Sequence, residues 1–158
     1  MTYTVLFVCA GNVGRSPLAE VMARRLLAES LGVEDGEVEA RGIRVLSAGT
    51  EAPAGILTSR RGVGLAEEIG ITMAPRPAQR LTKEMASGAD VIFGMDAGHV
   101  EHLSRWGFGD KTELLDPRSG EIPDPRRRDM AFFRDVRDQI AVALSERVPR
   151  IITAARPN

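Results

Sequence analysis

The segment that most constrains the fold is residues 2–20, TYTVLFVCAGNVGRSPLAE. Its first part, TVLFVC, is a continuous apolar run of the kind found in parallel strands buried on both faces. Glycines follow, and from Ser16 to about Gly32 the apolar residues recur at helical spacing. We expect Ser16 to be the N-cap of this helix and Pro17 to occupy its first helical position. A strand, a glycine-containing loop and a helix in this order predict the first unit of a parallel α/β sheet.

The rest of the chain continues this alternation, and no internal repeat interrupts it. Further strands are predicted at 41–49, 90–95 and 111–115, and further helices at 58–70, 82–89, 96–109 and 130–148. We expect the tail after Pro149 to fray. At 158 residues the chain is predicted to form one domain, residues 1–158, with helices on both faces of an open sheet. Sites in such sheets lie beyond the carboxyl ends of the strands, where Cys9 is found.

Composition excludes several classes of function. The chain is 43% hydrophobic and 27% charged with a net charge of −1, which is typical of a globular protein and leaves no basic surface for nucleic acid. One cysteine excludes an internal disulfide and a cysteine metal cluster. His99 and His102 have no acidic pair converging on them, so we expect neither a metal nor a cofactor.

The expected location is the cytoplasm. The N-terminus lacks the basic region of a signal peptide. No stretch approaches the roughly 20 apolar residues of a membrane span, so no membrane partner is expected. A free thiol survives in a reducing compartment. We expect a monomer or a weak dimer.

The loop after the first strand has the composition of an anion site with a nucleophile. A nucleotide P-loop needs four residues between its glycines and then lysine, whereas two residues separate Gly11 from Gly14 here. A better interpretation is a phosphate-binding loop in which five residues separate Cys9 from Arg15. A glycine-containing turn presents backbone N–H groups to an anion, and the helix that follows adds the positive end of its dipole. Arg15 adds a planar guanidinium that binds two phosphate oxygens. The positive electrostatic potential of this loop favours ionisation of the Cys9 thiol, and the thiolate can attack phosphorus in line. We expect Ser16 to donate a hydrogen bond to the sulfur.

Cleavage of a phosphate ester also requires a proton for the leaving oxygen. Asp116 and Asp124 both precede proline in the polar loop 116–129. Proline restricts the residue before it to extended backbone angles, which helps to orient the acid.

The motifs resemble, in order along nearly the whole chain, those of the low-molecular-weight protein tyrosine phosphatase family. The resemblance implies a three-layer sandwich with a four-stranded parallel sheet in the order 2-1-3-4. It also implies a phosphomonoester hydrolase, most simply a protein-tyrosine phosphatase, that acts on a phosphorylated protein or a small phosphoester. The matching segments are VCAGNVGRSPLAE (8–20), SAGT (47–50), AQRLTKE (78–84), VIFGMD (91–96) and DPRRRDMAFFRDVRDQI (124–140).

The resemblance also implies roles for individual residues. Cys9 forms a phosphocysteine, Asp124 is the general acid and base, and Ser16 stabilises the thiolate. Asn12 holds an unusual loop conformation with Ser47 as its hydrogen-bond partner. The phosphoryl group is bound by the loop Ala10, Gly11, Asn12, Val13, Gly14 and Arg15.

The chain departs from the family pattern where the substrate is selected. Gly14 replaces a second cysteine that often protects the nucleophile as a disulfide. Pro53, Arg126 and Arg127 occupy positions where tyrosine-specific members carry the aromatic walls of the pocket. Two interpretations are open for the run Arg126, Arg127 and Arg128. It is either a solvated loop or a positively charged segment that attracts an acidic substrate.

Three alternatives stay open. The first alternative is a phosphoarginine phosphatase, because Ala10 is small, like the residue beside the nucleophile in the bacterial phosphoarginine phosphatases of this family. NVGRS echoes the loop of an arsenate-mycothiol transferase or arsenate reductase of the same fold. A degenerate phosphate-binding module without turnover is the non-enzymatic alternative.

Overall fold

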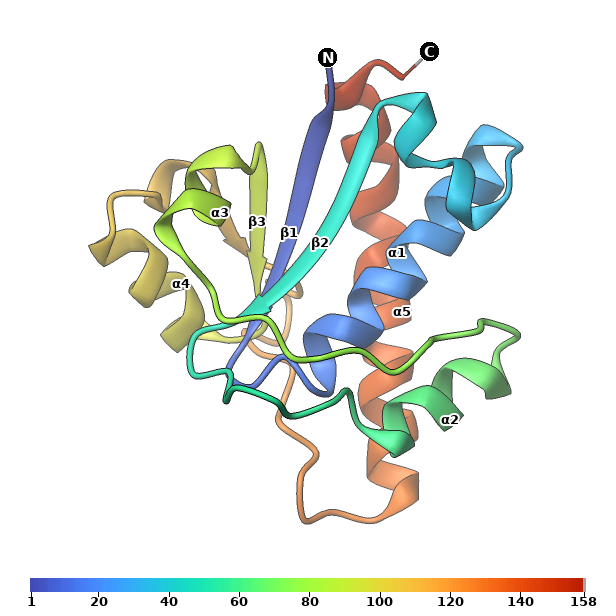
Figure 1. Cartoon of the computed structure of the whole chain (residues 1–158), viewed down its shortest axis with the longest axis vertical. Coiled ribbons are helices and arrows are strands. Elements are labelled where there is room, and N and C mark those ends of the chain that lie inside the picture. The colour runs from blue at the N-terminus through green and yellow to red at the C-terminus, as the bar shows by residue number, and fades with distance from the viewer. Residues whose placement is uncertain (158) are drawn as a thin grey trace.

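The computed structural model describes residues 1–157 and has the predicted α/β architecture (Figure 1). The strands are β1 (Tyr3–Cys9), β2 (Ile43–Gly49), β3 (Val91–Gly94) and β4 (Thr112–Leu114). The helices are α1 (Arg15–Leu31), α2 (Arg60–Glu68), α3 (Lys83–Gly88), α4 (Ala97–Arg105) and α5 (Met130–Ala155). Short 3-10 turns occupy Asp35–Glu37, Glu39–Arg41 and Gly109–Lys111.

The four strands form one parallel sheet in the order β2-β1-β3-β4, which confirms the predicted order. The chain moves from β1 to β2 on one side and then crosses to β3 on the other side. Connections therefore diverge at the carboxyl end of β1, the position at which open α/β sheets bind ligands. Cys9 lies there, paired in register with Gly49 at the end of β2.

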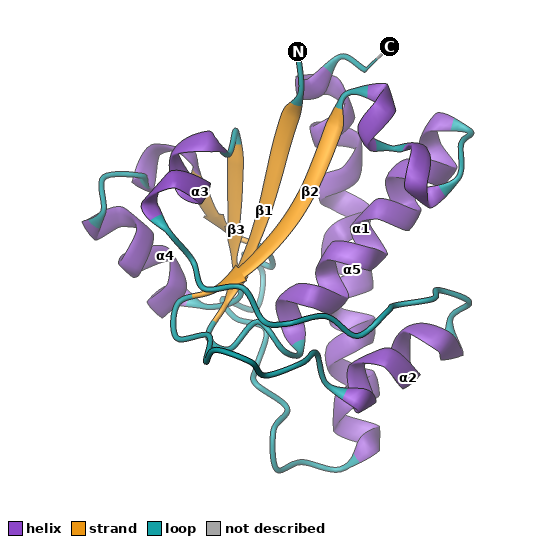
Figure 2. Ribbon diagram, in the orientation of Figure 1, coloured by secondary structure: helices purple, strands orange, loops and turns teal. Residues whose placement is uncertain are grey.

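Side-chain alternation along β1 divides the core into two parts. Val5 and Phe7 pack in a cluster with residues of α1, α2 and α5, whereas Leu6 and Val8 pack in a cluster with residues of α3 and α4. Figure 2 shows the sheet in orange between these two groups of purple helices. The predicted three-layer sandwich is confirmed.

Helix α5 is longer than predicted. Pro149 lies inside it, and the helix continues to Ala155 instead of fraying after residue 148. Proline removes one backbone hydrogen bond. Ile151, which is 3% exposed, packs in the core beyond Pro149, and this burial carries the helix past the proline.

Helix α1 begins at Arg15, two residues earlier than predicted, so Ser16 is not its N-cap and Pro17 is its third residue rather than its first. Gly14 is the N-cap and makes no side-chain capping bond. Ser16 lies in the first turn and is fully buried, because its hydroxyl is engaged by Cys9 and Asn12.

Within residues 1–157, no helix is long and apolar enough to cross a membrane. Over the same residues, no group of three or more histidine, cysteine or acidic side chains has an arrangement that could hold a metal ion.

Candidate active site

The thiol of Cys9 lies in the thiol loop, defined here as residues 9–16, and is surrounded by hydrogen-bond donors. The side chain is 2% exposed. Its Sγ lies 2.9 Å from Ser16 Oγ and accepts the backbone N–H of Asn12 over 3.2 Å. Ser16 Oγ accepts a bond from Asn12 Nδ2 at 2.9 Å, and of the two acceptors within reach of its proton the sulfur, at 2.9 Å, is nearer than the Ala48 carbonyl, at 3.5 Å. Two donors directed at one sulfur stabilise negative charge on it.

Asn12 holds the turn of the thiol loop. Its φ of 54° lies in the left-handed region, which asparagine tolerates better than most residues. The amide nitrogen donates to Ser16 Oγ and Ser47 Oγ at 2.9 Å each. The amide oxygen accepts the backbone N–H of Gln79 at 2.8 Å and Arg76 Nη1 at 3.4 Å. All four bonds of this buried amide are made, so the loop conformation is fixed, and the expected bond to Ser47 is present.

Glu20 and Arg76 support this turn from outside, and sequence reasoning picked out neither. Ser47 Oγ donates to Glu20 Oε1 at 2.6 Å and accepts Arg76 Nη2 at 2.5 Å. Arg76 Nη2 also pairs with Glu20 Oε1 at 2.8 Å. Glu20 follows Ser16 by one helical turn and so lies on the same face of the helix, and this spacing could have indicated that Glu20 belongs to the site. No local pattern in the sequence marked Arg76.

Arg15 connects the thiol loop to two other segments. Its side chain is 6% exposed, and its Nη1 donates to the carbonyl of Ile122 at 2.8 Å. The same nitrogen lies 3.7 Å from Oδ2 of Asp96, which follows β3 and caps α4. A buried guanidinium is stable only when it is paired, and these contacts supply the pairing. Asp96 is a third supporting residue, after Glu20 and Arg76, that the sequence analysis did not assign to the site.

Asp124 comes from the acid loop, residues 116–129, and reaches the same pocket as the thiol. The pocket has a volume of about 80 Å³. Liquid water occupies roughly 30 Å³ per molecule, so this space suits one small tetrahedral group. Its lining includes Cys9, Gly11, Arg15, Ser59, Asp124 and Phe133. The structure therefore brings together three residues that the sequence analysis assigned to catalysis, Cys9, Arg15 and Asp124.

The electrostatic surroundings of Asp124 favour its ionised form. Burial by itself acts to raise the pKa of this carboxyl, but the backbone N–H of Arg126 and the charges of Arg15 and Arg126 bring the pKa below its ordinary value. Arg126 contacts both carboxylate oxygens, through its backbone N–H at 3.0 Å and its Nε at 2.6 Å. The Asp124 side chain is 33% exposed, so it also exchanges protons with solvent.

The rim of the pocket combines one aromatic ring with several arginines. Phe133 of α5 lines the pocket, and the guanidinium of Arg61 lies 5.0 Å from the centre of its ring. Arg61 Nη1 also donates to the carbonyl of Arg128 at 3.2 Å. Arg126 and Arg127 line an adjoining cavity together with Asp124. The sequence analysis did not assign Phe133 to the site.

Pro53, which the sequence analysis placed on a pocket wall, is not in the lining of this pocket. The backbone N–H of Glu51 bonds the Ala10 carbonyl at 2.8 Å, after which residues 53–57 are all exposed. The chain meets the thiol loop again at Ser59, whose backbone N–H donates to the Val13 carbonyl at 2.7 Å. Ser59 therefore lines the pocket in place of Pro53.

Comparison with known proteins identifies the group to which this site belongs. A family model described as "Low molecular weight phosphotyrosine protein phosphatase" matches residues 4–151. A probable low molecular weight protein-tyrosine-phosphatase EpsP of Ralstonia nicotianae is 30% identical over 154 residues, which cover 96% of this chain and 97% of that protein.

Solved structures agree with the sequence comparison. The low molecular weight protein tyrosine phosphatase of T. tengcongensis superposes with a TM-score of 0.82 at 25% identity, covering 94% of this chain and 99% of that one. The YwlE arginine phosphatase of Geobacillus stearothermophilus superposes with a TM-score of 0.79 at 27% identity, covering 96% and 94%.

Proposed function

This chain belongs to the low molecular weight phosphotyrosine protein phosphatase family and is a cysteine-based hydrolase, and from this premise we propose a mechanism through a phosphocysteine on Cys9. The substrate is a phosphorylated protein. Arg15 and the backbone of the thiol loop bind the phosphoryl oxygens, and Asp124 transfers the proton.

In the first step the Cys9 thiolate attacks phosphorus in line with the leaving oxygen. The S–P bond forms as the P–O bond breaks, and the electron pair of that bond goes to the leaving oxygen, which takes the proton of Asp124. Arg15 lies at the base of the pocket, where it neutralises charge on the oxygens of the transferring group.

In the second step water attacks the phosphocysteine. The Asp124 carboxylate, regenerated by the first step, accepts a proton from that water. The S–P bond breaks, inorganic phosphate leaves, and the electron pair returns to sulfur. Ser16 and the backbone N–H of Asn12, at 2.9 and 3.2 Å from Sγ, stabilise the thiolate as it leaves.

The observation that carries this proposal is that Cys9, Arg15 and Asp124 line one pocket of about 80 Å³. A pocket of this volume holds the phosphoryl group and leaves the rest of the substrate on the rim. Phe133 contributes apolar surface there, and the surrounding arginines suit a phosphorylated residue within an acidic sequence.

Hydrolysis of p-nitrophenyl phosphate tests the mechanism. Cys9→Ser should lower kcat by at least about 10⁴-fold, because the nucleophile is lost while the pocket is kept. Acid quenching of the wild-type reaction should trap one phosphoryl group on Cys9, detectable by mass spectrometry of the tryptic peptide. Circular dichroism of the variant controls for folding. A Cys9→Ser variant that keeps a tenth of the activity would overturn the proposal.

Phosphoarginine is the second candidate substrate, because the superposing YwlE protein is named an arginine phosphatase. The arginines at the rim oppose it, since they repel a guanidinium leaving group. Comparing kcat/KM for matched peptides with phosphotyrosine or phosphoarginine decides between the two. Higher efficiency with phosphotyrosine supports the first candidate, and the reverse order supports the second.

We further propose that the protein works in the cytoplasm as a monomer or weak dimer. The proposed nucleophile is a free cysteine, which a reducing compartment keeps active. Sedimentation velocity at several protein concentrations tests the assembly, and a stable dimer at low concentration would contradict it.

A further inference from the structure

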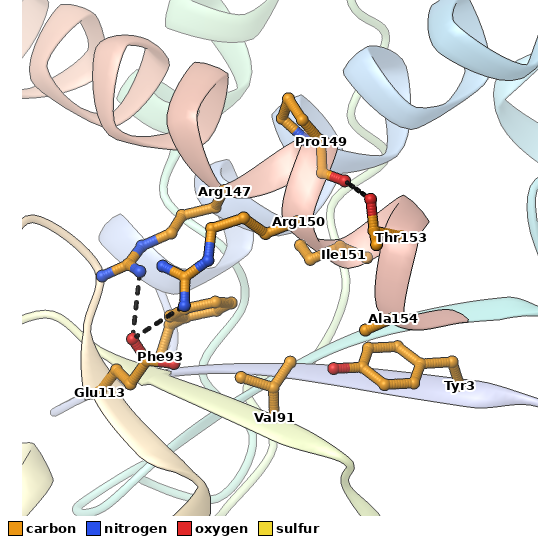
Figure 3. A pocket seen from close by; sticks show the side chains of 10 residues that line it. All are labelled: Tyr3, Val91, Phe93, Glu113, Arg147, Pro149, Arg150, Ile151, Thr153 and Ala154. Atoms are coloured by element: carbon orange, nitrogen blue, oxygen red, sulfur yellow. Dashed lines mark hydrogen bonds and ion pairs between the residues drawn. The ribbon is translucent and has the colours of Figure 1, made fainter. Parts of the chain in front are cut away.

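A second pocket lies at the opposite end of the sheet, where the strands begin. It opens between the first residues of β1 and β3, the strand β4 and the last turns of α5 (Figure 3). Its volume is about 460 Å³. Pockets for small molecules measure about 300–1,000 Å³, so this one has the size of a ligand site. It shares no lining residue with the pocket at Cys9.

One wall of this far pocket is a buried arginine that is held rigidly. The Arg147 side chain is 7% exposed. Its Nε donates to the Leu115 carbonyl at 3.3 Å, its Nη2 to the Leu114 carbonyl at 2.6 Å and its Nη1 to Glu113 Oε1 at 3.1 Å. The guanidinium also lies 5.1 Å from the centre of the Phe93 ring. Arg147 therefore fixes α5 on β4 and forms a preorganised cationic wall.

A second arginine lies at the mouth of the pocket and is weakly engaged. Arg150 is 67% exposed, and within residues 1–157 its one ionic contact is to Glu113 Oε1 at 3.9 Å. Figure 3 shows both guanidinium groups directed toward this single carboxylate. Among the residues that line the pocket, two cations and one anion leave one positive charge, and donors on Arg150 are available to a ligand.

Tyr3 adds a neutral donor to the same space. Burial, together with the carboxylates of Asp90 and Glu113, raises the pKa of Tyr3 above its ordinary value, so the hydroxyl keeps its proton at neutral pH. The ring of Tyr3 lies beside Ala154, with its hydroxyl directed toward Val91 (Figure 3). Among residues 1–157, no group makes a hydrogen bond to this hydroxyl.

The remaining wall is apolar. Val91, Phe93 and Ile151 line it and are at least nine-tenths buried, so they present carbon surface that does not rearrange. A flat or branched hydrocarbon body fits such a wall. The Glu113 carboxylate beside the arginines disfavours a dianion such as a phosphomonoester and tolerates a single negative charge.

We propose that the far pocket binds a small monocarboxylate with an apolar ring or chain. The carboxylate is bound by Arg150 and the Tyr3 hydroxyl, and the apolar body packs on Val91, Phe93 and Ile151. Six residue steps of β1 separate Tyr3 from Cys9, about 20 Å at the usual rise of a strand, so this ligand does not touch the phosphorylated substrate. The proposal is independent of the catalytic mechanism.

This proposal is tested by following the backbone amide NMR signals of the isotope-labelled protein while one of two probes is added. The titration is done in phosphate buffer, because inorganic phosphate then occupies the thiol loop. The probes are phenylacetate and 2-phenylethanol, which has a similar body without the charge. Phenylacetate should give saturable shifts at Val91, Glu113 and Ala154 and bind at least about tenfold more tightly than the alcohol. Equal binding of the two probes, or phenylacetate shifts confined to residues 9–16, would overturn the proposal.

Matched substitutions sharpen the test. Arg150→Glu should weaken phenylacetate about tenfold, because it replaces attraction with repulsion. Arg105→Glu is the control, since Arg105 on α4 has the same 67% exposure and should leave the affinity unchanged. Tyr3→Phe keeps the ring and should weaken binding about threefold through the lost hydrogen bond. Equal effects of the two arginine substitutions would contradict the assigned site.

Discussion

The thiol loop and the acid loop supply the two halves of one pocket, and they are held in different ways. In the thiol loop, Asn12 and Arg15 are 0% and 6% exposed and bond to segments between 35 and 107 residues away along the chain. In the acid loop, Asp124 bonds to Arg126, two residues away. Ile122 anchors the acid loop, because its N–H donates to Met95 and its carbonyl accepts Arg15.

This difference matches the proposed task of each loop. A nucleophile must keep a fixed distance to phosphorus, and a fully paired, buried network provides that. A proton donor and acceptor must exchange protons with solvent in every cycle, and the partly exposed Asp124 does so. Substitutions in the thiol loop should therefore alter stability and activity together, and substitutions at the exposed Asp124 and Arg126 of the acid loop should alter activity alone.

Apart from loss of the nucleophile, the largest effect is expected at Asp124 of the acid loop. Asp124→Asn should lower kcat by about 10²–10⁴-fold, because the leaving oxygen loses its proton donor. The loss should be greater for phenyl phosphate than for p-nitrophenyl phosphate, whose leaving group needs less protonation. The midpoint of thermal unfolding should change little. An equal loss for both substrates would contradict the role of Asp124 as the acid.

In the thiol loop, Asn12→Ala should lower both stability and kcat. The change removes four hydrogen bonds. The buried Ser16 hydroxyl loses a donor and the Gln79 N–H loses its acceptor, whereas Ser47 keeps its bond from Arg76. We expect a loss of about 2 kcal/mol in the free energy of unfolding, since unsatisfied buried groups cost about 1–3 kcal/mol each. The fall in kcat should be about 10–100-fold. Urea unfolding and steady-state kinetics measure the two quantities, and a loss of activity at unchanged stability would break the contrast between the loops.

Gly49 tests how closely β2 approaches the thiol loop. A Cβ atom at this position would lie 2.5 Å from the Ala10 carbonyl oxygen and 2.8 Å from the Asn12 nitrogen. Gly49→Ala should cost about 1–3 kcal/mol of stability and displace the loop. Gly64→Ala is the matched control, because no atom lies within 4 Å of its added Cβ and alanine favours the helix α2. Equal thermal midpoints for the two variants would show that the approach is not close.

The smallest effect concerns the pH dependence set by the acid loop. Arg126 lowers the pKa of Asp124, so Arg126→Ala should let the carboxyl keep its proton to higher pH. The decline of kcat on the alkaline side should move to higher pH, with a change in the maximum within about threefold, as expected for an exposed ion pair. High salt should also move the alkaline decline of the wild-type kcat to higher pH, because it screens the charge of Arg126. A shift of the profile to lower pH would contradict this role of Arg126.

Much of the fold followed from local patterns. Buried strands and amphipathic helices were predictable because each element shows its period and its boundaries within a few residues. The error at α5 arose because local preference favours a helix end at Pro149, whereas burial of Ile151 carries the helix on to Ala155.

The candidate site was predictable only in part. Cys9 and Arg15 share one loop, so their spacing was informative by itself. Asp124 was chosen over Asp116 by resemblance, since both precede proline. The Glu20–Arg76 pair joins positions 56 residues apart and leaves no local signature.

The sequence by itself determined the order of strands and helices, the loop that holds the thiol and the identity of the reacting groups. These depend on spacing within short segments, where chain geometry is nearly independent of distant contacts. Only the tertiary structure decided that Phe133 lines the pocket, that Arg76 and Glu20 support Asn12, and that Tyr3 and Arg150 border a second pocket. Such groupings depend on how the elements pack, because side chains far apart in the chain come together only when the sheet and its helices close around a common core.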